Sequence, residues 1–212
     1  LKPLTENIPK PLLKLGGRPI LEIIIRQLRD HGITEFYVSV NHMGDQIKNY
    51  FGDGSKLSVN IRYLEETSPL GTAGPLSLIS PVPPDSILVM NGDILTSIDF
   101  SSLLNFHGHQ GADITVATRE FEIEIPYGVV NMNDEMVGSI VEKPLKKFLV
   151  SAGIYVIEPH MLGEFVPHQP IDMPDFIRGT IDAQKNVAGF PIYEYWLDIG
   201  QIEEFKRASG DY

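Results

Sequence analysis

The chain has 212 residues, 42% of them hydrophobic and 21% charged, which is enough for one large globular domain, residues 1–212, with its own core. Because it contains no cysteine and no run of about 18 apolar residues, disulfides, thiolate metal sites, cysteine nucleophiles and membrane-spanning helices are excluded, and a cytoplasmic location is favoured. The formal net charge of -11 argues against nucleic acid or an anionic membrane as a partner and predicts that a phosphate ligand is bound locally, by a few cations and a metal.

Helical and strand patterns alternate along the first half of the chain. Pro19 opens an apolar stripe of helical period that continues to the break at Gly32, and the next segment is rich in β-branched and aromatic residues. The alternation predicts a mostly parallel sheet with helices on both faces, whose ligand sites lie at the carboxyl ends of the strands. The expected strands are 34–42, 59–64, 86–90 and 114–118, and the further helices are 44–51, 72–79 and 100–107.

The pattern changes after Glu120. Three closely spaced strand patterns follow, YGVVNM, MVGSIVEK and FLVSAGIYVIE, and they predict a mixed or antiparallel second half. In front of the first helix the sequence offers only a loop, whereas a domain of this type normally begins with a central strand, so we expect a strand and a loop upstream of Leu1. We further expect loops over 80–86 and 120–126, a helix over 175–182, a strand ending at Trp196 and a last helix over 202–208.

Two carboxylates directly follow predicted strands. Asp93 stands in NGD after one apolar strand, and Asp198 stands in WLDIG at the end of another. Mg²⁺ binds one or two carboxylates and completes its shell with water and substrate phosphates, so both residues are candidate ligands for one metal or for two. Alternatively, Asp93 lies in a solvated turn and Asp198 caps the helix that begins near Gln201. His107 and His109 are expected at a helix end rather than as metal ligands.

Two further segments carry residue types suited to ligand binding. SPLGTAGPL places Gly71 and Gly74 around Thr72, in a loop between a strand and a helix whose backbone can approach a flat ligand or an anion closely. VEKP places Glu142 and Lys143 side by side at a strand end. This pair either binds hydroxyl and phosphate groups of a ligand or is an ordinary exposed charged pair.

Taken together, these segments resemble the sugar-1-phosphate nucleotidylyltransferases, enzymes that join a nucleoside triphosphate to a hexose-1-phosphate and release pyrophosphate. Six motifs occur in the order of that family. LKPLTENIPKPLLKLGGRPILE is similar to the downstream half of its nucleotide-binding signature, LGTAG to its base-contacting loop, NGD to its metal motif, YGVV and EKP to its sugar-site motifs, and WLDIG to its closing motif. The resemblance implies an α/β fold that is Rossmann-like, with three αβα layers and a mixed, mostly parallel sheet of the nucleotide-diphospho-sugar transferase type.

The resemblance also implies roles for individual residues. In the family, the segment that would precede Leu1 is a glycine-rich loop ending in an arginine that binds the triphosphate, and Lys10, between two prolines, would be a second phosphate-binding cation. Ser151 stands where the family often has an asparagine that contacts the sugar. The implied residues are Lys10, Asp93 and Asp198 for catalysis, Lys10, Gly71, Thr72 and Asp93 for the nucleotide, Gly128, Glu142, Lys143 and Ser151 for the sugar phosphate, and Asp93 and Asp198 for Mg²⁺.

The function implied by the resemblance is transfer of a nucleotidyl group from a nucleoside triphosphate to a hexose-1-phosphate, with Mg²⁺ as cofactor. The loop LGTAG followed by Pro75 resembles that of the mannose-1-phosphate guanylyltransferase branch more than that of the thymidylyl branch, and this resemblance favours GTP as the substrate. The alternative is a catalytically silent regulatory subunit of the same fold that senses a nucleotide sugar. The sequence leaves open the base, the sugar and whether the chain forms a homo-oligomer.

Overall fold

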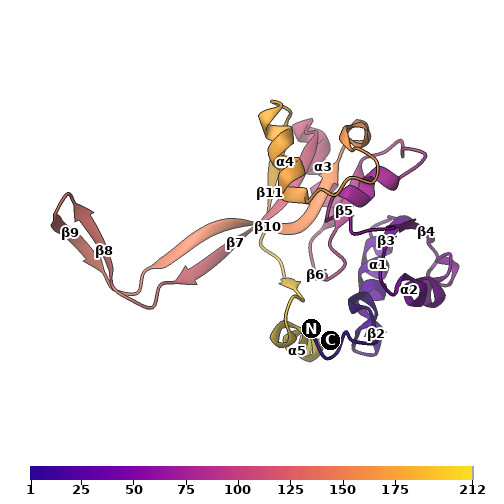
Figure 1. Ribbon diagram of the computed structural model, residues 1–212, viewed down its shortest axis with the longest axis horizontal. Coiled ribbons are helices and arrows are strands. Elements are labelled where there is room, and N and C mark those ends of the chain that lie inside the picture. Colours follow the sequence, from indigo (N-terminus) through magenta and orange to yellow (C-terminus); the bar gives the residue numbers. More distant parts are fainter. Residues whose placement is uncertain (212) are drawn as a thin grey trace.

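The computed structural model describes residues 1–211 and consists of a body from which a long two-stranded arm projects (Figure 1). The central sheet of the body has four strands in the order β11 (Val187–Ile192), β7 (Ile114–Glu124), β10 (Leu145–Ile157) and β5 (Ile87–Met90). β11 is parallel to β7, whereas β10 is antiparallel to both of its neighbours. The predicted mixed sheet is confirmed. Antiparallel pairs lie at its centre because β10 returns from β7 through the hairpin of the arm.

The remaining strands form four two-stranded pairs. β3 (Glu35–Val40) is parallel to β4 (Asn60–Glu65), as the alternating pattern predicted. β6 (Ile94–Thr96) pairs antiparallel with β12 (Trp196–Asp198), although the two are about a hundred residues apart in the sequence. The short β1 (Lys14–Leu15) and β2 (Arg18–Pro19) form a small hairpin, and β8 (Val129–Asn133) and β9 (Met136–Val141) form the far end of the arm, on the left in Figure 1.

Helices cover both faces of the central sheet, which confirms the three layers. Along β10, Ile154 and Val156 pack with α1 (Ile20–Asp30) and α3 (Phe100–Gln110), while Tyr155 and Ile157 pack with α4 (Met173–Asp182) on the opposite face. Successive side chains of a strand point to opposite faces, so this alternation shows a strand buried on both sides. The other helices are α2 (Gly44–Phe51), α5 (Ile202–Asp211) and the 3-10 turns η1 (Lys10–Leu12), η2 (Ser55–Leu57), η3 (Gly74–Leu78) and η4 (Pro159–Glu164).

Three expectations from the sequence were wrong. The α-helix expected over 72–79 is the short 3-10 turn η3, which ends just before Ser80 and Pro81, where a helix cannot continue. In the loop expected over 120–126, residues 120–124 instead continue β7, because the glutamates alternate with Phe121 and Ile123 in the two-residue period of a strand. The single strand expected to end at Trp196 is instead two strands, β11 and β12.

The arm is a two-stranded ribbon that carries both apolar and charged side chains. Phe121 lies opposite Phe148 on one face, whereas on the other face Lys147 Nζ bonds to Glu120 at 2.7 Å and to Glu122 at 2.8 Å. Many apolar side chains of the arm are exposed, and Leu149 is 73% exposed. The arm therefore contributes little to the core of the body.

A hollow of 230 Å³ separates the β3–β4 pair from the central sheet. Val38 of β3 and Leu88 and Met90 of β5 line it, together with Leu21 and Ile25 of α1. Within residues 1–211, β3 forms a ladder only with β4, and β5 forms a ladder only with β10, so β3 and β5 each have one edge directed away from their partner.

Over the same residues, no helix is both long enough and apolar enough to cross a membrane.

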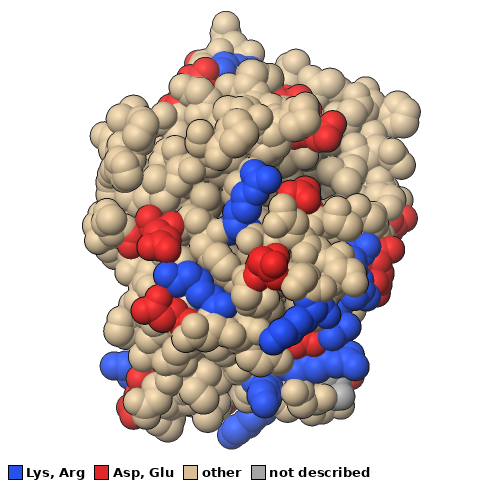
Figure 2. All heavy atoms as spheres, turned by 90° about the vertical axis from the view of Figure 1, so that its right-hand side faces the viewer, with Lys and Arg blue, Asp and Glu red and all other residues tan. Residues whose placement is uncertain are grey.

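Charges of both signs are mixed on the face drawn in Figure 2. Lysine and arginine side chains stand beside aspartate and glutamate over most of this face, and the basic ones are more frequent in its lower half. The fields of neighbouring opposite charges largely cancel at a distance, and salt at 0.1 M screens what remains beyond about 10 Å. Attraction of an anion to this face would therefore be local.

Candidate active site

Three charged side chains from three segments lie near one another, close to the ends of β5 and β12. Lys10 comes from η1, Asp93 follows β5, and Asp198 is the last residue of β12. Lys10 Nζ forms an ion pair with Asp93 Oδ2, and these side chains are 27% and 28% exposed. The β6–β12 ladder sets Asp198 opposite Ile94, and the amide of Ile199 donates to the carbonyl of Asp93 at 3.0 Å. The structure therefore brings together the three residues predicted to be catalytic.

A rigid turn holds Lys10. Proline precedes and follows it, and proline fixes its own φ near −65°, which is the value observed at Pro9. The amide of Leu12 donates to the carbonyl of Pro9 at 2.8 Å, and that of Leu13 to the carbonyl of Lys10 at 3.1 Å. Leu13 is buried in the core. The backbone that carries the ammonium group is thus ordered before any ligand arrives.

The electrostatics of this cluster favour a cation. Partial burial raises the pKa of the Asp198 carboxyl above its ordinary value, and the nearby charges of Asp93 and then Glu204 raise this pKa further, while Lys10 opposes the shift. The alternative that Asp198 caps α5 finds no support, because Glu204 accepts the amide of Gln201 at the start of that helix. Asp93 is likewise not a free turn residue, since it is paired with Lys10.

The ligand set fits magnesium. Residues 1–211 contain no cluster of three or more His, Cys, Asp or Glu side chains arranged to hold a metal, so the carboxylates of Asp93 and Asp198 stand as a pair. Ca²⁺ normally takes six to eight oxygen ligands and Zn²⁺ prefers nitrogen and sulfur, whereas Mg²⁺ is commonly held by one or two carboxylates and otherwise by water and phosphate.

The predicted nucleotide loop is joined to the start of α4. The amide of Thr72 donates to Asp172 Oδ1 at 2.9 Å, and the Thr72 hydroxyl accepts from the amide of Met173 at 2.8 Å. Gly71 has φ +78°, and a Cβ at this position would lie 2.6 Å from the carbonyl oxygen of Ile171. Sequence reasoning did not find Asp172. The only local signal is the Asp-Met-Pro pattern typical of a helix start, which says nothing about a contact with Thr72.

The predicted sugar-binding residues fall in two places. Gly128 and Glu142 flank the β8–β9 hairpin and lie against each other, and the amide of Lys143 donates to the carbonyl of Tyr127 at 3.2 Å. Figure 1 shows this hairpin far from the body, so the structure does not bring these residues to Asp93. Ser151 lies nearer the body, where its hydroxyl is 2.9 Å from that of Tyr155, beside an apolar hollow of 310 Å³.

An irregularity in β10 connects the arm to the segments that carry Asp93 and Asp198. The ladder between β7 and β10 shifts register over 151–155, the point at which the arm leaves the body. The amide of Asn91 donates to the carbonyl of Gly153 at 2.9 Å, and Trp196 Nε1 donates to the carbonyl of Ala152 at 2.8 Å. The segments that carry Asp93 and Asp198 are therefore both hydrogen-bonded to this part of β10. Sequence analysis did not identify Trp196 as a structural link.

His107 differs from expectation. It is 2% exposed, with Nδ1 2.8 Å from Thr115 Oγ1 and Nε2 2.9 Å from Glu158 Oε1, whereas His109 is exposed near the helix end as expected. Glu158 also accepts from the Ser86 hydroxyl at 2.7 Å, and this bond is the main cause of the lowered pKa of Glu158. This polar network ties α3 to the sheet and is a structural feature, not a metal site.

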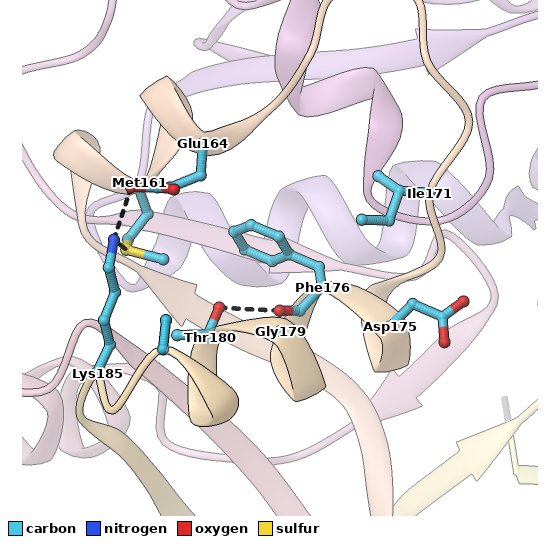
Figure 3. A pocket seen from close by; sticks show the side chains of 9 residues that line it. Met161, Glu164, Ile171, Asp175, Phe176, Gly179, Thr180 and Lys185 are labelled. Carbon is cyan, nitrogen blue, oxygen red and sulfur yellow. Dashed lines mark hydrogen bonds and ion pairs between the residues drawn. The ribbon is translucent and has the colours of Figure 1, made fainter.

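A separate cavity of 250 Å³ lies between η4 and α4 (Figure 3). Its charged groups already have partners, since Lys185 Nζ bonds to Glu164 Oε1 at 2.7 Å. The hydroxyl of Thr180 donates to the carbonyl of Phe176 at 2.9 Å, as the dashed line in Figure 3 indicates. The cavity offers no convergent free polar groups and is a weaker candidate than the Lys10 cluster.

Comparisons with known proteins find matches over nearly the whole chain. A family profile described as nucleotidyl transferase matches residues 1–212. The chain is 33% identical over 97% of its length to "Probable mannose-1-phosphate guanylyltransferase 1" of Oryza sativa subsp. japonica, and 30% identical over 98% to UTP--glucose-1-phosphate uridylyltransferase of Synechocystis. It spans 59% of the length of each of these relatives.

The fold is also found among solved structures. HddC from Yersinia pseudotuberculosis aligns with 96% of this chain and 90% of its own, with a TM-score of 0.71 and 22% sequence identity. At this level of identity the likeness shows the fold alone. The profile match over the whole chain, together with relatives that act on sugar-1-phosphates by name, shows that the chain belongs to the sugar-1-phosphate nucleotidylyltransferase family.

Proposed function

We propose that residues 1–212 form the catalytic domain of an enzyme that transfers a nucleotidyl group from a nucleoside triphosphate to a hexose-1-phosphate, giving a nucleotide sugar and pyrophosphate. The convergence of Lys10, Asp93 and Asp198 is the observation that carries the proposal. The names of the relatives support it, and the guanylyltransferases among them favour GTP. The proposed setting is cytoplasmic, with these two small molecules as partners rather than nucleic acid or a membrane.

The reaction needs no covalent enzyme intermediate. A phosphate oxygen of the sugar phosphate forms a bond to the α-phosphorus of the triphosphate, the bond between the α-phosphorus and its bridging oxygen breaks, and pyrophosphate leaves with the electron pair. The ammonium of Lys10 stabilises the negative charge that develops on the phosphate oxygens, and its fixed turn lowers the entropy lost on binding. Catalysis is then positioning and charge stabilisation.

Asp93 and Asp198 are the residues proposed to hold Mg²⁺, which when bound supplies positive charge to the phosphates. In the structure, Lys10 already contacts Asp93 Oδ2. The ammonium therefore holds one of the two carboxylates in the position where a cation is required. Release of Asp93 from Lys10 would free the lysine for the triphosphate.

The loop containing Gly71 and Thr72 is proposed to contact the nucleobase, and Gly128, Glu142, Lys143 and Ser151 the sugar phosphate. Turnover through all of these residues requires the arm to approach the body, because the β8–β9 hairpin lies far from it (Figure 1). The register shift over 151–155 is the place in the ribbon where such a bend would be accommodated. Glu142→Gln tests this requirement, since it changes activity only if the arm reaches the substrate.

The separation of the arm from the metal cluster also favours a second candidate function. A regulatory subunit of the same fold would bind a nucleotide sugar without transferring a nucleotidyl group. Retention of Lys10, Asp93, Asp198, Glu142 and Lys143 favours the enzyme.

The hollow between β3 and β5 supports the expectation of an additional strand N-terminal to Leu1. Apolar side chains of β3, β5 and α1 line the hollow, and the two strands each have one edge directed away from their ladder partner. An extended apolar segment would pair with both edges and join the β3–β4 pair to the central sheet. We propose that the glycine-rich phosphate loop follows this strand.

The experiment that tests the function is Mg²⁺-dependent pyrophosphate release by the full-length protein, with GTP, UTP, dTTP, CTP and ATP each combined with several hexose-1-phosphates. Release with one pair identifies reaction, base and sugar together, and Asp93→Ala and Asp198→Ala must abolish it. Silence with all pairs, together with nucleotide-sugar binding, would favour the regulatory function.

A further inference from the structure

Thr72 of the loop caps the first turn of α4, and Asp172, the residue before α4, binds the loop instead of its own helix. Asp172 is the residue before α4, where an aspartate normally accepts from the amides of its own first helical turn, but it makes no such bond. Asp172 Oδ1 instead accepts from the amide of Thr72 at 2.9 Å and from its hydroxyl at 3.3 Å. The hydroxyl oxygen of Thr72 accepts the amide of Met173, the first residue of α4, at 2.8 Å. The loop thus caps the helix, and the residue before the helix holds the loop.

Backbone hydrogen bonds also join the loop around Thr72 to Ile171, which precedes Asp172. The carbonyl of Ile171 accepts the amides of Ala73 at 3.0 Å and Gly74 at 3.1 Å, and the amide of Ile171 donates to the carbonyl of Leu70 at 2.9 Å. A side chain at Gly71 would collide with Ile171 and Asp172, since its Cβ would lie 2.6 Å and 2.7 Å from their oxygens. Glycine is required here by contact with the chain itself.

Thr72 and Asp172 both remain on the surface, although the residues beside them, Ala73 and Met173, are buried. A ligand can therefore reach the outer side of the loop while its inner side is anchored. The Thr72 hydroxyl already donates to Asp172 and accepts from Met173, so its single donor is used by this anchor and the loop backbone is the main surface that meets a base.

We propose that Asp172 is a positioning residue for the nucleotide: it sets the conformation of the Gly71–Thr72 loop and thereby the affinity and base selectivity of the site. This inference rests on the proposed function, in which that loop contacts the nucleobase. Asp172 acts through Thr72 and does not touch the substrate. Its loss frees the loop, so that the ordering of the loop must occur when the nucleotide binds.

The test compares Asp172→Ala, Asp172→Asn and Asp175→Ala in the full-length protein. Asparagine keeps an acceptor oxygen at the same place, whereas alanine removes it. Asp175 lies in the first turn of the same helix, is exposed and pairs with Arg178, so its replacement removes a nearby charge without touching the loop. The readouts are the dissociation constants of GTP, UTP, dTTP, CTP and ATP, and KM for each substrate separately.

Asp172→Ala is expected to weaken binding of the preferred nucleotide about tenfold and to reduce the preference among bases, because two hydrogen bonds to one carboxylate are lost. KM for the sugar phosphate is expected to stay within about twofold of the parent value, and Asp172→Asn and Asp175→Ala to bind nucleotide as the parent does. A purely structural role would instead lower the amount of active protein and leave the nucleotide dissociation constants unchanged.

Unchanged nucleotide affinity in Asp172→Ala overturns the inference, and so does equal loss in Asp172→Asn, which would mean that charge rather than acceptor geometry matters. If Asp172→Ala does not fold, Thr72→Val, which removes the hydroxyl from the same joint, must weaken nucleotide binding selectively. If the parent protein binds a nucleotide but releases no pyrophosphate, only the proposed function is refuted. The nucleotide dissociation constants of the variants still test the role of Asp172. A parent that binds no nucleotide refutes both.

Discussion

Replacement of Lys10 by methionine is expected to change metal and nucleotide binding in opposite directions. The ammonium of Lys10 occupies Asp93 Oδ2, so a metal that binds Asp93 must share or displace it. Methionine keeps most of the side-chain volume and removes the positive charge. The two carboxylates then attract Mg²⁺ more strongly, while the triphosphate loses a cation.

The size of the effect follows from the burial of the pair. The two side chains are 27% and 28% exposed, which places them between exposed ion pairs, worth about 0.2–1 kcal/mol, and buried ones, whose breakage costs about 3–5 kcal/mol. An intermediate value of about 1.5 kcal/mol corresponds to a tenfold change in an equilibrium constant. Lys10→Met should therefore bind Mg²⁺ about tenfold more tightly and the nucleoside triphosphate at least tenfold more weakly.

Titration calorimetry with Mg²⁺ alone, and nucleotide binding at saturating Mg²⁺, measure the two constants separately. Lys14→Met is the matched control, because it removes the same charge from an exposed position on β1, a few residues away. Weaker Mg²⁺ binding in Lys10→Met, or equal effects in both variants, would refute the reasoning that Lys10 and the metal compete for Asp93.

Three further variants test other parts of the structure. Asp198→Asn should abolish pyrophosphate release. It should also raise the unfolding temperature of the metal-free protein at pH 7, because the raised pKa of Asp198 means that its ionised carboxylate is disfavoured in the folded state. This gain in stability should vanish below the ordinary aspartate pKa, where Asp198 is protonated in both the folded and the unfolded state. His107→Ala should lower the free energy of unfolding, measured by urea denaturation, by about 3 kcal/mol, because it opens a cavity and leaves the buried Thr115 hydroxyl without its partner. The control His109→Ala should change this free energy by less than about 0.5 kcal/mol. Trp196→Phe keeps an aromatic side chain, although a smaller one, and loses the hydrogen bond to a buried carbonyl of β10. Stability should therefore fall by about 1–2 kcal/mol, and kcat should fall with little change in nucleotide KM. Unchanged kcat would show that this link does not position the segment that carries Asp198.

Local patterns in the sequence were sufficient for most helices and strands. The apolar spacing after Pro19 predicted α1, and the apolar side chains of the stripe are buried in the structure: Ile20, Leu21, Ile24, Ile25 and Leu28. The 44–51 and 100–107 helices were predicted close to their observed bounds. Such features depend on periodicity and capping within one turn or one strand, and these are properties of neighbouring residues.

The candidate residues themselves were also readable from the sequence, because strand ends followed by Asp and Gly carry their own signal. The meeting of Lys10 with Asp93 was implied only by resemblance. The structure shows the contact, across 83 residues of chain. What placed Asp198 beside Asp93 is the antiparallel pairing of two three-residue strands, β6 and β12, and such short strands have too little pattern to reveal a partner.

The arm and the joint between Thr72 and Asp172 were decided by tertiary structure alone. A strand pattern specifies which residues share a face but not how far a ribbon extends beyond the body, so the separation of Glu142 from Asp93 and Asp198 was not visible in the sequence. Thr72 and Asp172 are one hundred residues apart, and each alone resembles an ordinary loop threonine or helix cap. Residue types and their local periods determined the elements and the candidate chemistry. The contacts between distant elements depend on which surfaces pack together, and only the folded chain sets them.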